Sequence, residues 1–179
     1  MTDTTAPATT GRVRPRDPAP PLEVELLSGG TYVLAQQRPA RFSLVVFFRG
    51  LHCPVCASQL RELERGLDEL EQRGVEVVAV SGETRERTQQ LHDAWRLEHL
   101  PLAYGLTEEQ MRSWGLFISR GIGDEPALFN EPGLFLISTD GTVFYESLLS
   151  MPVGRPRLPD LLGGIDYWVE HGYPARGEA

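Results

Sequence analysis

The apolar run "FSLVVFF" over residues 42–48 constrains the fold more than any other feature of this sequence. It is apolar on both faces of an extended chain, which is typical of a central strand covered on both sides. Leucines at helical spacing follow between Cys53 and Gly74, and a second buried strand, "VEVVAVS", is predicted over residues 75–81. Strand, helix and strand in this order predict a right-handed βαβ unit.

Patterns on either side of this unit extend it to a larger sheet. Residues 22–36, "LEVELLSGGTYVLAQ", predict an N-terminal β-hairpin that turns at Ser28-Gly29-Gly30. A second hairpin is predicted over residues 132–149, in which Asp140 and Gly141 would both supply positive φ angles. Three further helices are predicted over residues 84–97, 107–116 and 158–174, and a short extended segment over residues 100–106. The sequence therefore predicts an α/β domain with a central mixed sheet flanked by helices.

The length of the chain, 179 residues, is that of one ordinary domain. Residues 1–20 are rich in Thr, Ala and Pro and show no periodicity, so we expect a flexible arm there. Residues 21–179 are expected to form the single folded domain.

Composition excludes several classes of function. The formal net charge of −8 and the pI near 5.0 leave no basic surface for nucleic acid or for an anionic membrane. All 17 basic residues are arginines, which excludes mechanisms that need a lysine amine. Neither a signal-peptide core nor an apolar run long enough to span a membrane is visible. We therefore expect a cytoplasmic protein, in which cysteine thiols are kept reduced.

Cys53 and Cys56 form the motif "CPVC" where the central strand gives way to the first helix. A structural disulfide is disfavoured because a domain of this size folds without one and the expected compartment is reducing. Half of a zinc site is disfavoured because no histidine lies at a matching spacing from the two cysteines. We expect neither a metal nor a cofactor, and favour a redox pair at a strand-to-helix turn.

The position of the motif gives the two thiols different chemistry. With Cys53 as the N-cap and Pro54 as the first helical residue, the Cys53 thiol faces free backbone N–H groups. These donors and the helix dipole lower the pKa of Cys53, which is expected to be the solvent-accessible nucleophile. Two α-carbons three residues apart in a helix are separated by roughly 5 Å, within the range of a disulfide. Because only Cys53 sits at the helix cap, Cys56 is expected to be the more buried thiol, and it would resolve the intermediate formed at Cys53.

The segment "FFRGLHCPVCASQLREL", together with "EPGLFLISTDGTV", resembles the thioredoxin superfamily, and more closely the peroxiredoxin-like branch of the AhpC/TSA (alkyl hydroperoxide reductase/thiol-specific antioxidant) family. The resemblance implies a thioredoxin-like fold and thiol-based redox chemistry with Cys53 as the nucleophile. The family's motif is Pro-x-x-x-Thr-x-x-Cys, followed later in the chain by an arginine. This chain has Val46 in place of the proline, Gly50 in place of the threonine and Pro132 in place of the arginine. In that family the threonine hydroxyl and the guanidinium hold the peroxide. Pro132 instead matches the thioredoxin position of a cis-proline, which would present the backbone of Glu131 to an extended substrate.

Three further residues are candidates for the site. Arg49 and Arg120 are candidate cations for the thiolate or for a developing oxyanion. His52 would favour the thiolate if it were protonated, although a solvent-facing loop residue is the simpler interpretation. Arg120 lies in "ISRGIGDEPALFNEPG", within which a long functional loop is expected near the cysteines.

These observations favour a thiol-dependent antioxidant oxidoreductase that carries out dithiol–disulfide exchange through Cys53 and Cys56. A hydroperoxide reductase that uses the same two cysteines is the alternative, and a redox-silent binding protein with this fold is a third. Because the family's threonine and arginine are missing, disulfide reduction is expected to be faster than hydroperoxide reduction. The expected partners are a disulfide or hydroperoxide substrate and a thioredoxin-type or low-molecular-weight thiol reductant, and a homodimer stays open.

Overall fold

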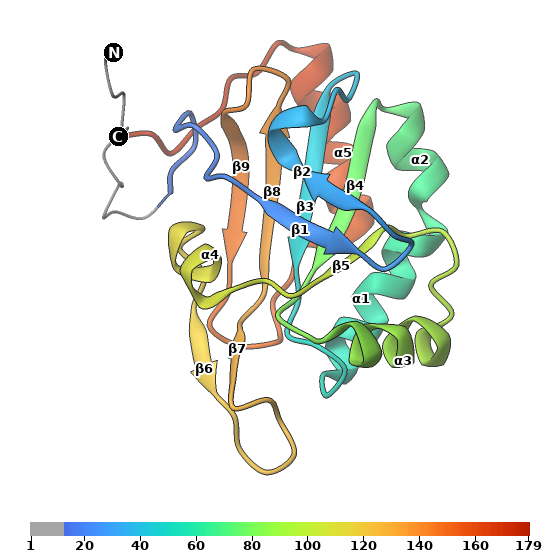
Figure 1. Cartoon of the computed structure of the whole chain (residues 1–179). Coiled ribbons are helices and arrows are strands. Elements are labelled where there is room, and N and C mark those ends of the chain that lie inside the picture. Colours follow the sequence, from blue (N-terminus) through green and yellow to red (C-terminus); the bar gives the residue numbers. More distant parts are fainter. Residues whose placement is uncertain (1–12) are drawn as a thin grey trace, which may run out of the picture.

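The computed structural model describes residues 13–179 (Figure 1). Its strands are β1 (Glu23–Leu26), β2 (Thr31–Val33), β3 (Phe42–Phe47), β4 (Val75–Val80), β5 (Leu102–Tyr104), β6 (Ile118–Arg120), β7 (Leu128–Asn130), β8 (Gly133–Ser138) and β9 (Val143–Leu148). Its helices are α1 (Pro54–Arg65), α2 (Leu67–Gln72), α3 (Arg85–Trp95), α4 (Glu108–Ser113) and α5 (Leu158–Glu170), with a short 3-10 turn at Leu34–Gln36.

A seven-stranded sheet in the order β2-β1-β5-β4-β3-β8-β9 forms the centre of the fold. β3 lies parallel to β4 and antiparallel to β8, so the sheet is mixed. Every residue of β3 is buried, as its apolar sequence predicts. The prediction of an α/β fold with a central mixed sheet is confirmed, and β1 and β2 form the predicted N-terminal hairpin.

The side chains of β3 alternate between two separate cores on the two faces of the sheet. Leu44 and Val46 belong to the core that contains residues of α1, α2, α3 and α5. Val45 and Phe47 belong to the core on the other face, which contains residues of α4. Successive side chains of a strand point to opposite faces, so a strand that is apolar throughout needs cover on both. Figure 1 shows α1, α2 and α5 behind the sheet and α4 in front of it.

The helix predicted between Cys53 and Gly74 is divided at Gly66 into α1 and α2. A Cβ atom at Gly66 would come within 2.1 Å of the Cδ2 atom of Leu158, so the start of α5 packs directly against the break. The sequence pattern missed this division because the leucine spacing continues across it.

The turn between β8 and β9 differs in detail from the prediction. Gly141 has φ +82°, but Asp140 does not adopt a positive φ angle. The Asp140 carboxylate instead accepts hydrogen bonds from the backbone N–H and the hydroxyl of Thr142, at 3.0 and 2.7 Å. Asp140 therefore stabilises the turn through its side chain rather than through a left-handed backbone.

Residues 13–20, the described part of the expected arm, lie along the β8–β9 hairpin. Val13 is buried, and the backbone N–H of Arg16 donates to the carbonyl oxygen of Val143 at 2.7 Å. Residues 1–12 fall outside the described residues, so the division into an arm and a domain stays a prediction.

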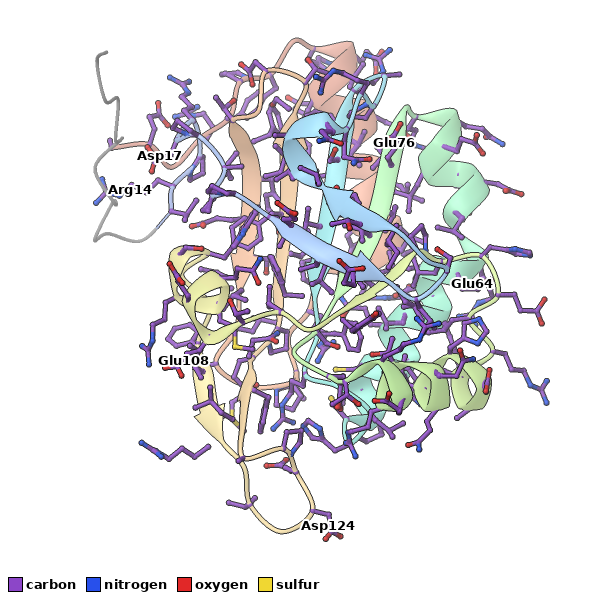
Figure 2. All side chains as sticks on the ribbon, viewed as in Figure 1. Arg14, Asp17, Glu64, Glu76, Glu108 and Asp124 are labelled. Carbon is purple, nitrogen blue, oxygen red and sulfur yellow. The ribbon has the colours of Figure 1, made fainter. Side chains whose placement is uncertain are left out.

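Glu76 and Glu108 are exposed on the outer surface (Figure 2), whereas Glu83 and Glu131 are buried. Asp124 is exposed in the loop between β6 and β7, which extends away from the main sheet (Figure 2). Within residues 13–179, the structure contains no helix that combines the length and the apolar character needed to cross a membrane.

Candidate active site

Cys53 and Cys56 lie just beyond the carboxyl end of β3, at the start of α1. Cys53 is the N-cap of α1, with extended φ and ψ angles of −107° and 103°, and Pro54 is the first helical residue. The Cys53 Sγ atom accepts a hydrogen bond from the backbone N–H of Cys56 at 3.3 Å, and both cysteines are free thiols. The cap geometry is therefore the one predicted from the spacing of the motif.

The two thiols differ strongly in acidity. A hydrogen bond from the Cys56 side chain, together with the Cys56 backbone N–H and the positive charge of Arg155, lowers the pKa of Cys53 to about 5. Burial, and then the hydrogen bond given to Cys53, raise the pKa of Cys56 well above its ordinary value. At neutral pH the pair therefore consists of a Cys53 thiolate and a Cys56 thiol.

Both sulfurs are buried, and the expectation of a solvent-accessible Cys53 is wrong. Cys53 is 1% exposed and Cys56 is 0% exposed. Both belong to the core cluster that also contains Phe48 and Leu60. The sequence-based argument placed Cys53 at a helix end, where thiols are often open to solvent, but it could not show what packs over that end.

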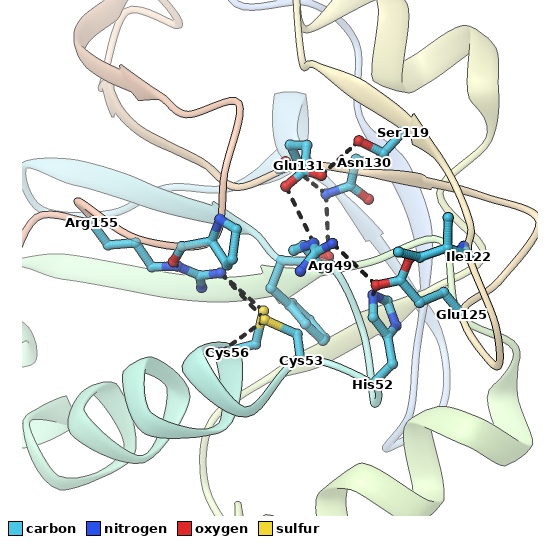
Figure 3. Close-up of polar contacts among 12 residues, drawn as sticks. Arg49, His52, Cys53, Cys56, Ser119, Ile122, Glu125, Asn130, Glu131 and Arg155 are labelled. Atoms are coloured by element: carbon cyan, nitrogen blue, oxygen red, sulfur yellow. Dashed lines mark hydrogen bonds and ion pairs between the residues drawn. The ribbon is translucent and has the colours of Figure 1, made fainter.

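Arg155 is a functional candidate that the sequence did not reveal. Its Nη2 atom lies 3.1 Å from the Cys56 Sγ atom and 3.8 Å from the Cys53 Sγ atom (Figure 3). The residue comes from the segment between β9 and α5, about 100 positions further along the chain. Its Nε atom donates to the carbonyl oxygen of Pro152 at 2.8 Å, and its Nη1 atom donates to Gln59 Oε1. No local sequence pattern marks such an arginine, because the contact depends on the path of a non-periodic segment.

Arg49, one of the two predicted cations, lies beside the cysteines but is paired with acids (Figure 3). Its Nη2 atom is 3.3 Å from Glu125 Oε1, and its Nε atom is 3.2 Å from Glu131 Oε2. The guanidinium carbon lies 4.7 Å from the centre of the Phe129 ring. Arg49 also contributes to the low pKa of Cys53, less than Cys56 and Arg155 do.

Glu131 contributes its side chain to the site rather than its backbone. It is 3% exposed, and its carboxylate accepts a hydrogen bond from the Ser119 hydroxyl at 2.7 Å in addition to pairing with Arg49. The backbone N–H of Glu131 donates to the carbonyl oxygen of Phe117 at 2.7 Å. This donor is therefore unavailable to an extended substrate, which corrects the role expected for it.

Pro132 lies in the segment that leads into β8 and is buried. Residues 13–179 contain no cis peptide bond, so the thioredoxin-like cis-proline arrangement is absent from this part of the chain. The carbonyl oxygen of Pro132 accepts a hydrogen bond from the backbone N–H of Leu149 at 3.0 Å. Pro132 thus joins the β8 end of the sheet to the segment that carries Arg155.

His52 is neither charged nor solvent-facing, so both interpretations made from the sequence are wrong. Its side chain is 9% exposed, and its ring lies 4.7 Å from the ring of Phe129. Burial, and then the positive charge of Arg49, lower the pKa of His52 below its ordinary value. The imidazole is therefore neutral at pH 7 and supplies no charge to the thiolate.

Arg120 does not join the site. It is exposed on β6, where it pairs with Leu128 of β7. Ser119, the preceding residue, turns its hydroxyl toward Glu131, and side chains alternate along a strand. Part of the predicted long loop is also this β6–β7 hairpin, which leaves residues 121–127 as the connection.

Comparison with known proteins identifies the family. Residues 15–146 match the family model described as "AhpC/TSA family". This chain belongs to the AhpC/TSA family. Membership confirms the predicted peroxiredoxin-like resemblance and the prediction of a thiol-dependent oxidoreductase enzyme. None of the curated protein sequences matches this AhpC/TSA chain.

Solved peroxiredoxin structures share the fold of this AhpC/TSA protein at low sequence identity. A peroxiredoxin-like protein from Aquifex aeolicus is 17% identical with a TM-score of 0.71, and 88% of each chain is covered. Peroxidoxin BcpB from Mycobacterium tuberculosis is 15% identical with a TM-score of 0.71, covering 87% of this chain and 98% of that one. Reduced 2-Cys peroxiredoxin from Plasmodium vivax is 19% identical with a TM-score of 0.72, covering 93% of this chain and 89% of that one. The predicted thioredoxin-like fold is therefore confirmed.

The position at which the AhpC/TSA motif carries a threonine is Gly50 in this chain, and the structure explains why no side chain stands there. Gly50 has φ +133°, and a Cβ atom at this position would come within 2.3 Å of Glu83 Oε1. Glu83 is buried, accepts a hydrogen bond from the backbone N–H of Leu51 at 2.9 Å and forms an ion pair with Arg87. Glu83 was not predicted, because a single acid after a strand carries no distinctive signal.

Residues 13–179 contain no group of three or more His, Cys, Asp or Glu side chains that could hold a metal ion.

Proposed function

We propose that this protein is a thiol peroxidase in which the Cys53 thiolate reduces a small hydroperoxide. The observation that carries the proposal is the position of the Cys53 sulfur, buried beside the protonated Cys56 and within 3.8 Å of the Arg155 guanidinium. The thiolate attacks the terminal oxygen of the hydroperoxide, the O–O bond breaks, and the alkoxide leaves and takes up a proton to become an alcohol. Cys53 becomes a sulfenic acid.

Two features support a hydroperoxide over a protein disulfide as the substrate, which reverses the order expected from the sequence. A cysteine residue that is 1% exposed is reached more easily by a small molecule than by the disulfide of a folded protein. Charge that develops on the leaving oxygen also needs a donor, and Arg155 supplies a guanidinium in place of the family's missing threonine and arginine.

Cys56 completes the cycle. Its thiolate attacks the sulfur of the Cys53 sulfenic acid, the S–O bond breaks, and hydroxide leaves and is protonated to water, which produces the Cys53–Cys56 disulfide. Two equivalents of a low-molecular-weight thiol, or one dithiol of thioredoxin type, then restore both thiols and are themselves oxidised to a disulfide. The identity of the reductant, a cytoplasmic location and assembly into a homodimer stay predictions.

Dithiol–disulfide exchange with an external disulfide is the second candidate. The placement of "CPVC" at a helix N-cap, with a low Cys53 pKa, favours it. It requires the segments around Cys53 to open, because a disulfide must approach the sulfur in line. The same low pKa argues against a redox-silent binding protein, in which nothing would require an ionised thiol.

Parallel rate measurements test this proposal. Reduced protein is mixed with hydrogen peroxide, and separately with insulin, and the second-order rate constants for loss of its thiols are compared. We expect the hydrogen peroxide rate constant to be the larger, and two free thiols to fall to none without any intermolecular crosslink. A larger rate constant for insulin would make disulfide exchange the function.

Cysteine variants separate the two roles. Cys53→Ser is expected to abolish reaction with the peroxide, whereas Cys56→Ser is expected to react once and to stop as a sulfenic acid that dimedone labels at Cys53. Labelling of Cys56 in the Cys53→Ser protein, at a rate similar to that of Cys53, would contradict the assignment of the nucleophile.

A further inference from the structure

We infer that Arg155 is the catalytic cation of the resolving step: once Cys53 has been oxidised, its guanidinium stabilises the Cys56 thiolate that closes the disulfide. This inference rests on the proposed function, because it assigns a role within the second half of that cycle. It goes further by assigning Arg155, and not Arg49, to the ionisation of Cys56.

The geometry places Arg155 closer to the resolving sulfur than to the nucleophile. Its Nη2 atom is 3.1 Å from the Cys56 sulfur and 3.8 Å from the Cys53 sulfur (Figure 3). The other two nitrogens of the guanidinium are engaged, with Gln59 Oε1 and with the carbonyl oxygen of Pro152. These two hydrogen bonds fix the plane of the guanidinium, so that Nη2 points at the cysteine pair.

The charge balance also distinguishes Arg155 from Arg49. Arg49 is paired with the carboxylates of Glu125 and Glu131, which offset its charge. Within residues 13–179, Arg155 forms no ion pair with a carboxylate, and its two other acceptors are a neutral amide and a carbonyl. The Cys53 thiolate is therefore the negative group that balances Arg155 in the reduced protein.

Oxidation of Cys53 removes that negative charge. A sulfenic acid or a mixed disulfide at Cys53 is neutral, and a partly buried guanidinium without a counter-charge is unfavourable. Cys56 is the nearest group that can supply a new negative charge, at 3.1 Å. The state of Cys53 thus determines which sulfur Arg155 stabilises.

The acidity of Cys56 agrees with this sequence of events. In the reduced protein, burial, the hydrogen bond to Cys53 and the negative charge of Cys53 raise the pKa of Cys56, while the charge of Arg155 lowers it. The two contributions that come from the Cys53 thiolate disappear when Cys53 is oxidised, and the contribution of Arg155 remains. Cys56 therefore stays protonated during the first step and ionises for the second.

The resolving step can be followed without any peroxide by using 4,4′-dithiodipyridine, a neutral small disulfide. The Cys53 thiolate displaces one thiopyridone and forms a mixed disulfide. Cys56 then loses its proton to solvent, attacks the Cys53 sulfur and displaces the second thiopyridone, which leaves the Cys53–Cys56 disulfide. The rate of the first thiopyridone release is proportional to the reagent concentration, whereas the rate of the second release is independent of it. A high reagent concentration therefore separates the two phases in time.

Arg155→Gln is the decisive variant. At pH 7 we expect the second phase to slow by about tenfold or more, and its pH midpoint to rise by about one unit, because the thiolate fraction of Cys56 falls. The first phase is expected to change by less than about threefold, because Cys56 makes the largest contribution to the low pKa of Cys53 and keeps it ionised at pH 7. Arg155→Lys, which keeps the charge, is expected to recover most of the second-phase rate.

Arg112→Gln is the matched control, because Arg112 is an exposed arginine whose side chain pairs with Glu108 away from the cysteines. It should leave both phases unchanged. Should Arg155→Gln fail to fold, Gln59→Leu replaces it: releasing Nη1 of Arg155 is expected to slow the second phase alone.

An unchanged second phase in Arg155→Gln, or equal slowing of both phases with no shift of the pH midpoint, would overturn the inference. In the replacement variant, an unchanged second phase would do the same. Failure of the proposed peroxidase function would be visible separately. In that case the wild-type protein would show both thiopyridone phases, with their dependence on Arg155, but would not consume hydrogen peroxide.

Discussion

The carboxylate of Glu83 occupies the space into which a side chain at Gly50 would project. A Cβ atom built on Gly50 comes within 2.3 Å of Glu83 Oε1 and 2.9 Å of its Cδ atom, and the backbone φ of +133° is itself a glycine conformation. Glu83 cannot move aside freely, because it also holds the backbone N–H of Leu51 and the side chain of Arg87. The turn that leads to Cys53 therefore depends on glycine at position 50.

Gly50→Ala is expected to lower the free energy of unfolding by about 2–4 kcal/mol, through backbone strain and the displacement of Glu83. The control is Gly29→Ala, where φ is +101° and a Cβ atom would meet nothing within 4 Å. Strain alone should cost this control about 1–2 kcal/mol. Urea denaturation of the reduced proteins measures both values, and equal losses would show that Glu83 gives way without cost.

The reaction of Cys53 with hydrogen peroxide is expected to be independent of pH above about 6 and to fall as the pH drops through about 5, where the thiolate is protonated. Stopped-flow measurement of the second-order rate constant between pH 4.5 and 8, with Cys56→Ser as a check that a single thiol is followed, gives this profile. A midpoint near the ordinary cysteine pKa of about 8.5 would contradict the assignment of a resting thiolate.

The same pKa shift predicts a pH dependence of stability. The pKa of Cys53 is lower in the folded protein than in the unfolded chain, where it is about 8.5. The contribution of its ionisation to the free energy of unfolding is therefore fully present above about pH 8.5 and is lost as the pH falls through about 5. The difference in unfolding free energy between reduced wild-type protein and Cys53→Ser should therefore shrink across this window. A constant difference would show that Cys53 is not ionised in the folded state.

Glu131→Gln removes one of the two carboxylates that balance Arg49. Glu131 is 3% exposed, so the loss of its charge should lower the free energy of unfolding by about 2–3 kcal/mol. Glu108→Gln is the comparison at the surface, where the ion pair with Arg112 should be worth about 0.5 kcal/mol or less. Chemical denaturation of the two variants, side by side, decides whether the Arg49–Glu131 pair stabilises the site.

Arg120→Ala is expected to change neither the peroxide rate constant nor the stability beyond about 0.5 kcal/mol, because the side chain is exposed and points away from Glu131. A tenfold loss of the peroxide rate constant in Arg120→Ala would show that β6 moves toward the cysteines during the reaction.

Arg49→Met is expected to lower the free energy of unfolding much more than Arg120→Ala does, since it leaves the buried Glu131 carboxylate without its cation.

Local patterns were sufficient for the parts of this protein that depend on neighbours in the chain. The run over residues 42–48 is a central strand because no other arrangement buries both of its faces. Cys53 caps α1, as predicted, and its sulfur accepts a hydrogen bond from the backbone N–H of Cys56. The two partners lie three residues apart, so the local sequence contains both halves of the interaction.

Prediction from the sequence failed at one local turn, and otherwise where the partner is distant or where packing decides. Asp140 illustrates a local failure, because its carboxylate satisfied the turn without a left-handed backbone. The division at Gly66 depends on Leu158, which α5 brings against it from more than 90 positions away. The neutral state of His52 depends on burial beside Arg49 and Phe129 rather than on its place before Cys53.

The sequence by itself determined the central strand, whose two apolar faces need cover on both sides. It also determined the helix start at Cys53 and the lowered pKa of that thiol, since hydrogen bonds and the helix dipole act within one helical turn. Only the tertiary structure decided which cation reaches the sulfurs and how far they are buried. Arg155 lies 99 residues from Cys56 in the chain, and its 3.1 Å contact exists because β9, the following segment and α5 return to the start of α1. Coulombic contacts at such short range act between whichever groups the fold brings together, and hydrophobic periodicity contains no information about where a single charged side chain in a loop will end.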